Sequence, residues 1–372
     1  MRIAIDIQKV REFGLGTHIW NLVRNLSQID SQNHYFLLGS KQQYSELGAL
    51  GPNFELIEQP QETNIWNLHA RTPLLLRRNS IDLFHVPHYE APILIPCRLL
   101  VTIHDCVHLL FPQEGSSKFE NYRRYVYTKR VVNSAERIIA VSGSTRDDLI
   151  NIFDLKPQKV QVVHNALDER FEAEHDSATQ KQVLERYQLK DPFILYSGQI
   201  KPHKNIHRLI EAFAVLKSEL ENDKIYRELK LIIIGDELSK HQYLRLTVIR
   251  SGVQQDVRFF GFVPYPVLRV FYETAAAFAS PSLYEGFGLS PLEAMANRTP
   301  VVASNTSSLP EVLGEAALLV NPENVFEIAR AIKELLINNT IRQRVIENGL
   351  IQVQKFSWRS SAEKVLRVYR GL

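Results

Sequence analysis

The stretch DERFEAEHDSATQKQVLERYQLKDPFILYSG, residues 168–198, divides the chain into two parts. Residues 168–191 are polar and charged and contain no strand candidate, whereas FILYSG (193–198) is a short apolar run that ends in glycine. Short apolar runs separated by longer segments with helical spacing are typical of βα units in a parallel sheet. We therefore predict a linker at 168–191, after which a parallel sheet starts at residue 193.

The same rhythm of short apolar runs occurs on both sides of this linker. We predict strands at 2–7, 34–39, 54–57, 82–86, 99–104, 137–142, 160–163, 193–198, 229–235, 257–261, 276–280, 300–303 and 317–320. The pattern predicts an α/β protein with two Rossmann-like, doubly wound domains, 1–167 and 192–356. Open α/β sheets bind ligands at the carboxyl ends of their strands, so two such domains facing each other place the site in the cleft between them.

The chain length and its last segment agree with this division. At roughly 100 to 200 residues per domain, 372 residues predict two domains. Segment 357–372 has the pattern of a final amphipathic helix, with Ser357 as its cap. The sequence leaves open whether this helix returns to the N-terminal domain.

Composition excludes several classes of protein. A net charge of +3 is too small to indicate a nucleic-acid partner. The two cysteines, Cys97 and Cys106, form no zinc-ligand pattern and no disulfide framework, which fits a reducing cytoplasm. No apolar run reaches about 18 residues, and the start MRIAIDIQKV (1–10) is too short and interrupted for a signal peptide. We predict a cytoplasmic protein without a membrane span.

The stretch YEGFGLSPLEAMA (284–296) follows a predicted strand and carries two glutamates, Glu285 and Glu293. Gly286 and Gly288 let the backbone approach a ligand closely, and amides beside a helix N-terminus form an anion-binding corner. A diphosphate suits such a corner. The glycines therefore predict a phosphate cradle between the two acids.

Glu293 also has a purely structural explanation. Residues 290–293, Ser-Pro-Leu-Glu, match a helix capping box with proline in the first turn. In that case Glu293 satisfies the amide of the cap residue and has no ligand. The sequence around Glu285 indicates no comparable structural role for it.

In its context the E-x7-E pattern EGFGLSPLE (285–293), followed by AMA, resembles the retaining glycosyltransferases of family 4. The resemblance extends over essentially the whole chain and implies the GT-B architecture, two facing Rossmann-like domains with a nucleotide sugar in the cleft. It implies that Glu285 contacts the donor sugar and that Glu293 accepts hydrogen bonds from the ribose hydroxyls. It also implies that the amides of Phe287, Gly288 and Leu289 hold the donor phosphates.

A second candidate lies in SGQIKPHKN (197–205), after the first predicted strand of the second domain. Lys204 is able to neutralise the charge that grows on a departing diphosphate, although it is also compatible with a solvated surface. The family has a glycine, commonly an arginine, and a lysine here, and Lys204 matches the lysine. Gln199 stands where the arginine is common, so one positive charge of the donor phosphate site is missing.

The third candidate is the glycine loop in EFGLGTHIWNLVRNL (12–26), which opens an amphipathic helix that Thr17 is placed to cap. A dinucleotide fingerprint needs glycine at Ile19, so a dehydrogenase is disfavoured. By resemblance, the loop lies against the donor phosphates, with Gly16 closest to them.

In VTIHDCVHLLFP (101–112), His104 closes an apolar strand at its carboxyl end. Histidine inside an apolar strand is usually a packed core residue, but at this end of a strand it is expected to face a ligand. The family has a histidine here against the donor sugar. We therefore predict His104 as a catalytic residue, together with Lys204 and Glu285, and Asp105 as its companion in the same motif.

The segment KFENYRRYVYTKRVV (118–132) carries five basic residues and one acid, with aromatic residues between them. The ordinary interpretation is a solvated helix face. The alternative is an interfacial helix that meets anionic lipid or a lipid-linked acceptor, which would make the protein peripheral at the inner face of the cell membrane.

Together with the family resemblance, these patterns imply the retaining, metal-independent transfer of a hexose from a nucleotide diphosphate sugar to a glycan or lipid-linked acceptor in surface polysaccharide synthesis. No D-x-D triplet occurs, and no cofactor is predicted. UDP-glucose is the favoured donor, and GDP-mannose is the alternative. A GT-B nucleotide-sugar epimerase and a non-catalytic sugar-nucleotide-binding subunit also stay open, the latter because of Gln199.

Overall fold

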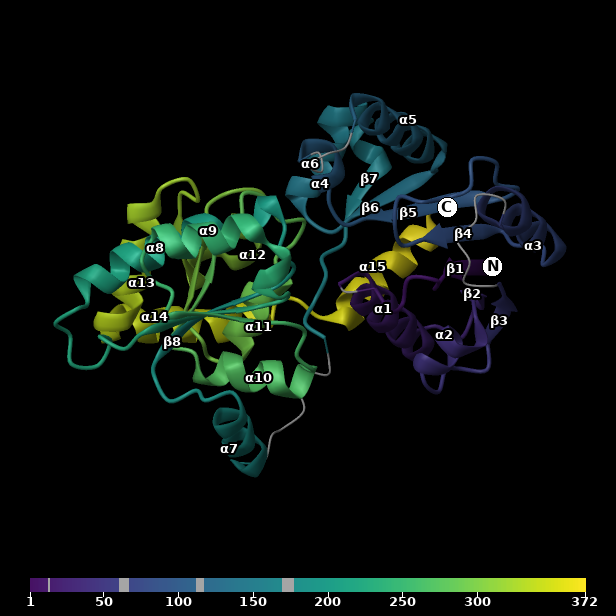
Figure 1. The fold of residues 1–372 in the computed structure, drawn as a ribbon. Coiled ribbons are helices and arrows are strands. Elements are labelled where there is room, and N and C mark those ends of the chain that lie inside the picture. The colour runs from purple at the N-terminus through teal and green to yellow at the C-terminus, as the bar shows by residue number, and fades with distance from the viewer. Residues whose placement is uncertain (13, 60–66, 112–116, 169–176) are drawn as a thin grey trace. The chain divides into compact units, whose positions relative to one another are not determined.

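The computed structural model describes residues 1–12, 14–59, 67–111, 117–168 and 177–372. The chain forms two compact units (Figure 1). Unit 1 comprises residues 1–166 and 356–372, and unit 2 comprises residues 167–355.

In its described part, unit 1 is built on seven parallel strands in the order β3-β2-β1-β4-β5-β6-β7. The strands are β1 (Arg2–Asp6), β2 (His34–Gly39), β3 (Phe54–Glu58), β4 (Leu83–Val86), β5 (Arg98–Ile103), β6 (Arg137–Ala140) and β7 (Val160–Val162). The α-helices are α1 (Leu15–Ile29), α2 (Lys41–Glu46), α3 (Thr72–Arg78), α4 (Val107–Leu110), α5 (Lys118–Ser134), α6 (Gly143–Phe153) and α15 (Trp358–Arg370). The order reverses between β1 and β4, as it does in a doubly wound sheet.

Helices cover both faces of this sheet because the strands are apolar on both sides. Ile3 and Ile5 of β1 belong to one hydrophobic cluster with residues of α1 and α15, such as Leu22. Ala4, between them, belongs to the cluster on the other face, with residues of α3, α5 and α6, such as Leu149. Successive side chains of a strand point to opposite faces, so a continuous apolar run fills two cores.

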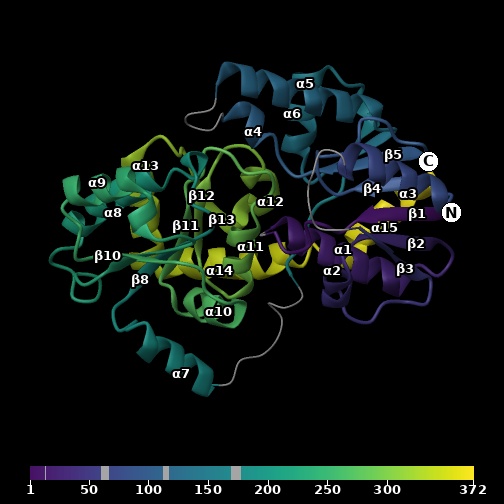
Figure 2. The same ribbon diagram turned by 45° about the vertical axis from the view of Figure 1, so that its right-hand side comes forward.

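Helix α15, at the end of the chain, belongs to unit 1. Its predicted cap is confirmed, since the Ser357 side chain accepts a hydrogen bond from the Ser360 amide. The helix packs along α1, as both views show (Figures 1 and 2). Tyr369 is fully buried, and its hydroxyl lies 2.7 Å from Nδ1 of His85 on β4. The returning helix therefore completes one face of the unit 1 sheet.

In its described part, unit 2 is built on six parallel strands in the order β10-β9-β8-β11-β12-β13. The strands are β8 (Phe193–Ser197), β9 (Lys230–Ile234), β10 (Val257–Phe260), β11 (Ala277–Ser280), β12 (Val301–Ser304) and β13 (Ala317–Val320). The α-helices are α7 (Ser177–Arg186), α8 (Ile206–Glu219), α9 (Gln242–Arg250), α10 (Tyr265–Thr274), α11 (Leu289–Ala296), α12 (Leu309–Leu313), α13 (Val325–Ile337) and α14 (Asn339–Val353). The order reverses between β8 and β11.

The predicted linker at 168–191 is wrong for its described second part, because α7 belongs to unit 2. Figures 1 and 2 both show α7 below α10. Val183 is buried, and the ring of Tyr187, four residues later, contacts Phe260 and Phe271. Segment 177–191 is polar in sequence because most described side chains of this helix are exposed and only a narrow face is apolar. Residues 169–176 lie outside the described residues.

All thirteen predicted strands are confirmed, each within one or two residues of its predicted ends. Neighbouring parallel strands end at the same edge of their sheet, so β8, β11 and β12 present their following loops side by side. The loops after β1, β4 and β5 do the same in unit 1. In the described residues, no helix has the length and hydrophobicity needed to cross a bilayer.

Candidate active site

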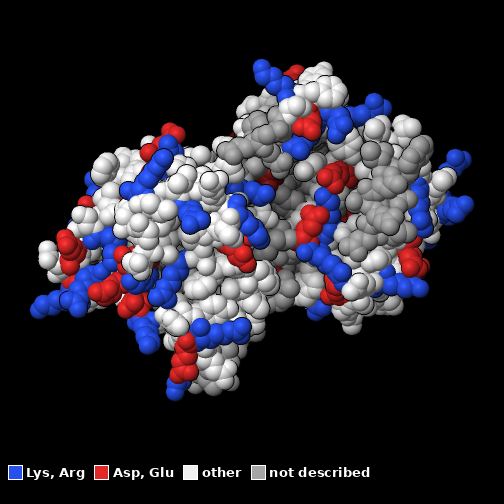
Figure 3. All heavy atoms as spheres, in the orientation of Figure 1, with Lys and Arg blue, Asp and Glu red and all other residues white. Residues whose placement is uncertain are grey.

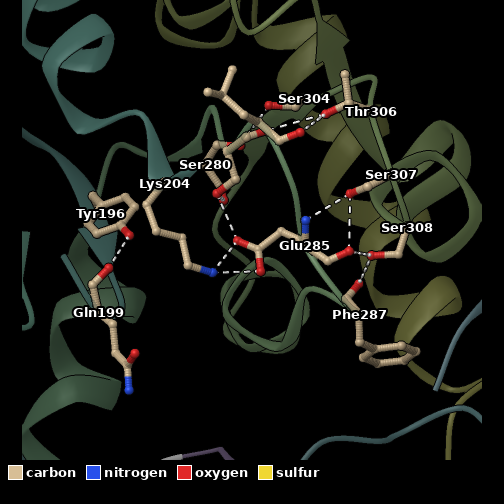
Figure 4. Close-up of polar contacts among 12 residues, drawn as sticks. Tyr196, Gln199, Lys204, Ser280, Glu285, Phe287, Ser304, Thr306, Ser307 and Ser308 are labelled. Atoms are coloured by element: carbon tan, nitrogen blue, oxygen red, sulfur yellow. Dashed lines mark hydrogen bonds and ion pairs between the residues drawn. The ribbon is translucent and has the colours of Figure 1, made fainter. Parts of the chain in front are cut away.

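In unit 2, the loop between β11 and α11 carries Glu285. Both carboxylate oxygens of Glu285 lie 2.7 Å from Nζ of Lys204 (Figure 4). The Ser282 hydroxyl donates a hydrogen bond of 2.7 Å to one of them. The Lys204 and Glu285 side chains are 19% and 14% exposed. The structure therefore joins two predicted catalytic residues, 81 positions apart, in one half-buried ion pair.

Lys204 is held by the turn that follows β8. It ends a 3-10 turn (Pro202–Lys204), and Asn205 next to it adopts a left-handed conformation with φ of 59°. The Asn205 side-chain amide donates to the carbonyls of Pro281 and Pro322 at 2.9 and 2.7 Å. This fully buried side chain fixes the lysine turn to the glutamate loop. The sequence prediction missed it, although asparagine is one of the few residues that enter this conformation readily.

Two serines after β12 hold the main chain around Glu285. The Ser307 hydroxyl lies 2.8 Å from the Glu285 amide and accepts its hydrogen bond. The Ser308 hydroxyl contacts the carbonyls of Glu285 and Phe287 at 2.9 and 3.0 Å. Figure 4 shows both serines beside the Glu285 main chain, on the side away from Lys204. These positioning residues were also missed, because a Ser-Ser pair carries no motif of its own.

The predicted phosphate cradle forms the start of α11. Gly288 has φ of 101°, and a Cβ there would lie 2.7 Å from a Leu309 methyl group, so this turn requires glycine. The helix begins at Leu289, and within the described residues no side chain caps it. Its first amides therefore carry the partial positive charge of a helix N-terminus. Gly286 and Phe287 lie in the same loop, with the Phe287 side chain buried. Their contact with phosphates stays a prediction.

Glu293 does not form the predicted capping box. The helix starts two residues before Pro291, so Ser290 lies inside it and caps nothing. Instead, the Glu293 carboxylate accepts a hydrogen bond of 2.8 Å from the hydroxyl of Tyr272, which also lies 2.5 Å from the Ser197 hydroxyl. Burial raises the pKa of Glu293 to about 7; the Tyr272 hydrogen bond lowers it, and the charge of Asp168 raises it further. The structural alternative is therefore wrong, and the ribose role stays a prediction.

Gln199 contributes its main chain to the turn and leaves its side chain exposed. Its carbonyl accepts a hydrogen bond of 3.0 Å from the Tyr196 hydroxyl. Figure 4 shows the Gln199 side-chain amide directed away from Lys204 and Glu285. The donor contact of Gln199 stays a prediction, and its side chain makes no contact with the ion pair in Figure 4.

Gly16 lies in the first turn of α1, which begins at Leu15 after Gly14 takes a φ of 77°. The predicted Thr17 cap is wrong, because the helix starts at Leu15, before Thr17, and no described side chain caps it. A Cβ on Gly16 would lie 2.1 Å from the Val10 carbonyl oxygen. Close packing against the preceding loop therefore requires glycine at this position, whatever its role toward a donor.

His104 follows β5, as predicted, and is only partly buried. Its Nε2 lies 3.1 Å from the Pro87 carbonyl oxygen. Burial lowers the pKa of His104 to about 4, although the Pro87 contact opposes this change. A carbonyl can only accept, so the neutral ring carries its proton on Nε2 and has its lone pair on Nδ1. Asp105 accepts a hydrogen bond from the Val107 amide, which gives it a local duty at the start of α4.

Comparison with known proteins agrees with these motifs. A family model described as Glycosyl transferases group 1 matches residues 178–352, and one described as Glycosyltransferase Family 4 matches residues 14–171. O-antigen chain mannosyltransferase B of Escherichia coli is 30% identical over 307 residues, which cover 82% of this chain and 78% of that protein. The chain belongs to glycosyltransferase family 4. The prediction of a glycosyltransferase is thereby confirmed.

Two further similarities concern longer relatives and the fold. The serotype-specific mannosyltransferase WbdA of Escherichia coli is 31% identical over 280 residues, 75% of this glycosyltransferase but only 34% of WbdA. The chain thus spans about a third of that relative. HepE of Anabaena, solved in complex with UDP-glucose, covers 100% of both chains with a TM-score of 0.77 and 18% identity. At this identity the likeness shows the shared GT-B fold.

We expect Glu285→Ala to lower the turnover of this glycosyltransferase by about 100-fold or more, because it removes the partner of Lys204 and the predicted sugar contact. Binding of the free nucleotide should change little. Steady-state kinetics and calorimetry with the nucleotide measure the two effects. Glu273→Ala, on the surface of α10, is the control. Near-normal turnover in Glu285→Ala would contradict the assignment.

We expect Glu293 to make folding stability fall as pH rises from about 4.5 to 7. Its pKa is raised from 4.5 to about 7, so the folded chain binds more protons than the unfolded chain within this range. Glu293→Gln should melt about 2–4 °C above the wild type at pH 8, which is roughly 1 kcal/mol for a half-buried group. The difference should disappear below pH 4.5.

The same variant tests the ribose role. A carboxylate accepts hydroxyl hydrogen bonds best when ionised, so nucleotide affinity of the wild type should rise between pH 6 and pH 8. The rise should be absent in Glu293→Gln. Titration calorimetry at the two pH values measures it, and an equal rise in both proteins would rule out Glu293 as its source.

Proposed function

We propose that the protein is a retaining mannosyltransferase that transfers mannose from GDP-mannose to a growing surface polysaccharide. The observation that carries the proposal is the 30% identity to an O-antigen chain mannosyltransferase over 82% of the chain. This favours the GDP-mannose alternative over the predicted UDP-glucose. HepE, whose structure contains UDP-glucose, is more distant in sequence.

In the proposed reaction, the bond between the sugar anomeric carbon and the diphosphate breaks, and its electron pair leaves with the diphosphate. The acceptor oxygen forms the new bond on the same face of the sugar, and its proton passes to the leaving phosphate oxygen. Lys204 and the first amides of α11 stabilise the negative charge that develops on the diphosphate. No metal ion is required in this proposal.

Glu285 and His104 act on the sugar. Ser282 keeps one Glu285 oxygen oriented when Lys204 turns toward the diphosphate. The other oxygen is then available to a sugar hydroxyl. His104, whose lone pair lies on Nδ1, accepts a hydrogen bond from a second hydroxyl. These groups orient the sugar without forming a bond to it.

The exposed apolar side chains of helix α5 favour a lipid-linked acceptor at the cytoplasmic face of the membrane. Phe119, Tyr122 and Val126 are 71%, 65% and 44% exposed. Their spacing of three and four residues places them on one side of the helix. Tyr125 and Tyr127 instead pack inward, against Phe153 and the Ala91 carbonyl.

Basic side chains flank this apolar stripe. Lys118, Arg123, Lys129 and Arg130 are exposed. Figure 3 shows Lys and Arg side chains around uncharged surface where α5 lies, at the top of unit 1. An exposed apolar stripe between cations fits the boundary of an anionic bilayer. We propose that α5 holds the enzyme on the membrane that carries its acceptor.

We expect GDP and GDP-mannose to raise the melting temperature of the protein more than UDP, UDP-glucose or ADP-glucose. A ligand at about 100 times its Kd contributes about 2.7 kcal/mol, or roughly 5–10 °C. A thermal-shift panel measures this, and slow release of mannose from GDP-mannose confirms a productive complex. Greater stabilisation by UDP-glucose would overturn the mannose proposal.

We expect the protein to sediment with phosphatidylglycerol vesicles and much less with phosphatidylcholine vesicles. Lys118→Glu and Arg123→Glu should each reduce binding about fivefold or more, because each cation contributes about 1 kcal/mol at an anionic surface. Phe119→Ser should also reduce it. Phe326→Ser is the matched control, because Phe326 is 72% exposed in unit 2. Equal losses in Phe119→Ser and Phe326→Ser would contradict the role of α5.

A further inference from the structure

His18, in the second turn of α1, lies against His104 and is only 4% exposed. The centres of the two imidazole rings are 4.6 Å apart, and the rings are nearly perpendicular, at 86°. Nδ1 of His18 lies 2.8 Å from the side-chain oxygen of Asn165. The ring also meets the indole of Trp358 at 5.4 Å. His18 thus supports the ring that we propose as a sugar contact.

Both rings are neutral near pH 7, so each carries one proton. Burial, together with the neighbouring His104, lowers the pKa of His18 to about 3, and burial lowers that of His104 to about 4. The Asn165 oxygen can only accept, so the proton of His18 is on Nδ1 and the lone pair is on Nε2. Asn165 thereby fixes both the tautomer and the orientation of His18.

The imidazole of His18 is not what stability alone would select. Its Nε2 is buried and has no hydrogen-bond partner among the residues that the structure describes. Such an atom costs about 1–3 kcal/mol, whereas an apolar ring of similar size would leave no polar atom unsatisfied. A buried polar group of this kind calls for an explanation. The contact between the two rings offers an explanation, which is that His18 orients the His104 ring.

The partners of His18 lie where the chain leaves and re-enters unit 1. The chain passes to unit 2 after Ala166 and returns at Phe356. We call these two points the first and the second crossing. Asn165 is next to the first crossing, and Trp358 is two residues after the second. Within unit 1 the two crossings also contact each other, since the Ser361 hydroxyl donates a hydrogen bond of 2.6 Å to the His164 carbonyl. His18 therefore contacts both crossings and His104.

We propose that His18 is a positioning residue, which Asn165 and Trp358 hold in place and which fixes the His104 ring with Nδ1 available to the donor sugar. The inference rests on the proposed sugar contact of His104. It goes beyond that contact by assigning a role to His18 and Asn165.

A double-mutant cycle with His18→Ala and His104→Ala tests the proposal, with GDP-mannose turnover as the readout. We expect His18→Ala to lower kcat about 10- to 100-fold with little change in KM, because a small displacement of a catalytic group has effects of this size. In the His104→Ala background, removing His18 should have no further effect. Asn165→Ala should behave in the same way, and it replaces His18→Ala if that variant does not fold.

Tyr369→Phe is the control, because it removes a buried hydrogen bond between α15 and the sheet without touching His104. Its kcat should equal that of the wild type. If the losses of kcat in His18→Ala and His104→Ala multiply in the double variant, the role of His18 is overturned, whereas the sugar contact of His104 is not. Normal turnover in His104→Ala would overturn the proposed sugar contact, and the role of His18 with it.

Nitrogen NMR of the ligand-free, 15N-histidine-labelled protein gives a second readout that needs no donor. The His104 signals, identified by their loss in His104→Ala, should show one tautomer in the wild type. They should move toward a tautomer mixture in His18→Ala and stay unchanged in Tyr369→Phe. Unchanged His104 signals in His18→Ala would overturn the proposal even if the enzyme prefers another donor.

Discussion

Parallel strands that end at one edge of a sheet determine where every candidate residue of unit 2 lies. Lys204 follows β8, Glu285 follows β11, and the serines that hold the Glu285 main chain follow β12. These strands are neighbours in the sheet, so residues up to 104 positions apart meet in one place. The Lys204–Glu285 ion pair exists because of this arrangement, and Asn205 keeps its two loops in register.

The sequence was sufficient for the strands because their signal is local. An apolar run that ends in glycine or a polar residue needs no knowledge of its neighbours, and all thirteen runs proved to be strands. The errors arose where a local signal competed with a distant partner. Ser290 and Glu293 match a capping box, but Gly288 starts the helix earlier and Tyr272, 21 residues away, binds the carboxylate.

The residues that sequence reasoning missed act only through tertiary contacts. Ser307 and Ser308 hold a loop 22 or 23 residues earlier in the chain, and His18 meets a side chain 147 residues away. No spacing rule connects such positions. The catalytic candidates were found because family resemblance marks them. No family pattern marks the side chains that support them, although His18 and Asn205 lie inside the quoted stretches 12–26 and 197–205. A structure is needed to separate supporting residues from ordinary serines and histidines.

The ion pair also bears on how Lys204 would bind the diphosphate of the proposed donor. Before a donor binds, Lys204 and Glu285 neutralise each other in a half-buried site, so neither charge is left without a partner. In the proposed reaction, an incoming diphosphate competes with Glu285 for the lysine, while the Ser282 hydroxyl still donates to one carboxylate oxygen. The second oxygen then needs a new donor, and a sugar hydroxyl can supply it. We propose that, with Gln199 in place of the common arginine, this exchange of partners couples phosphate binding to sugar binding.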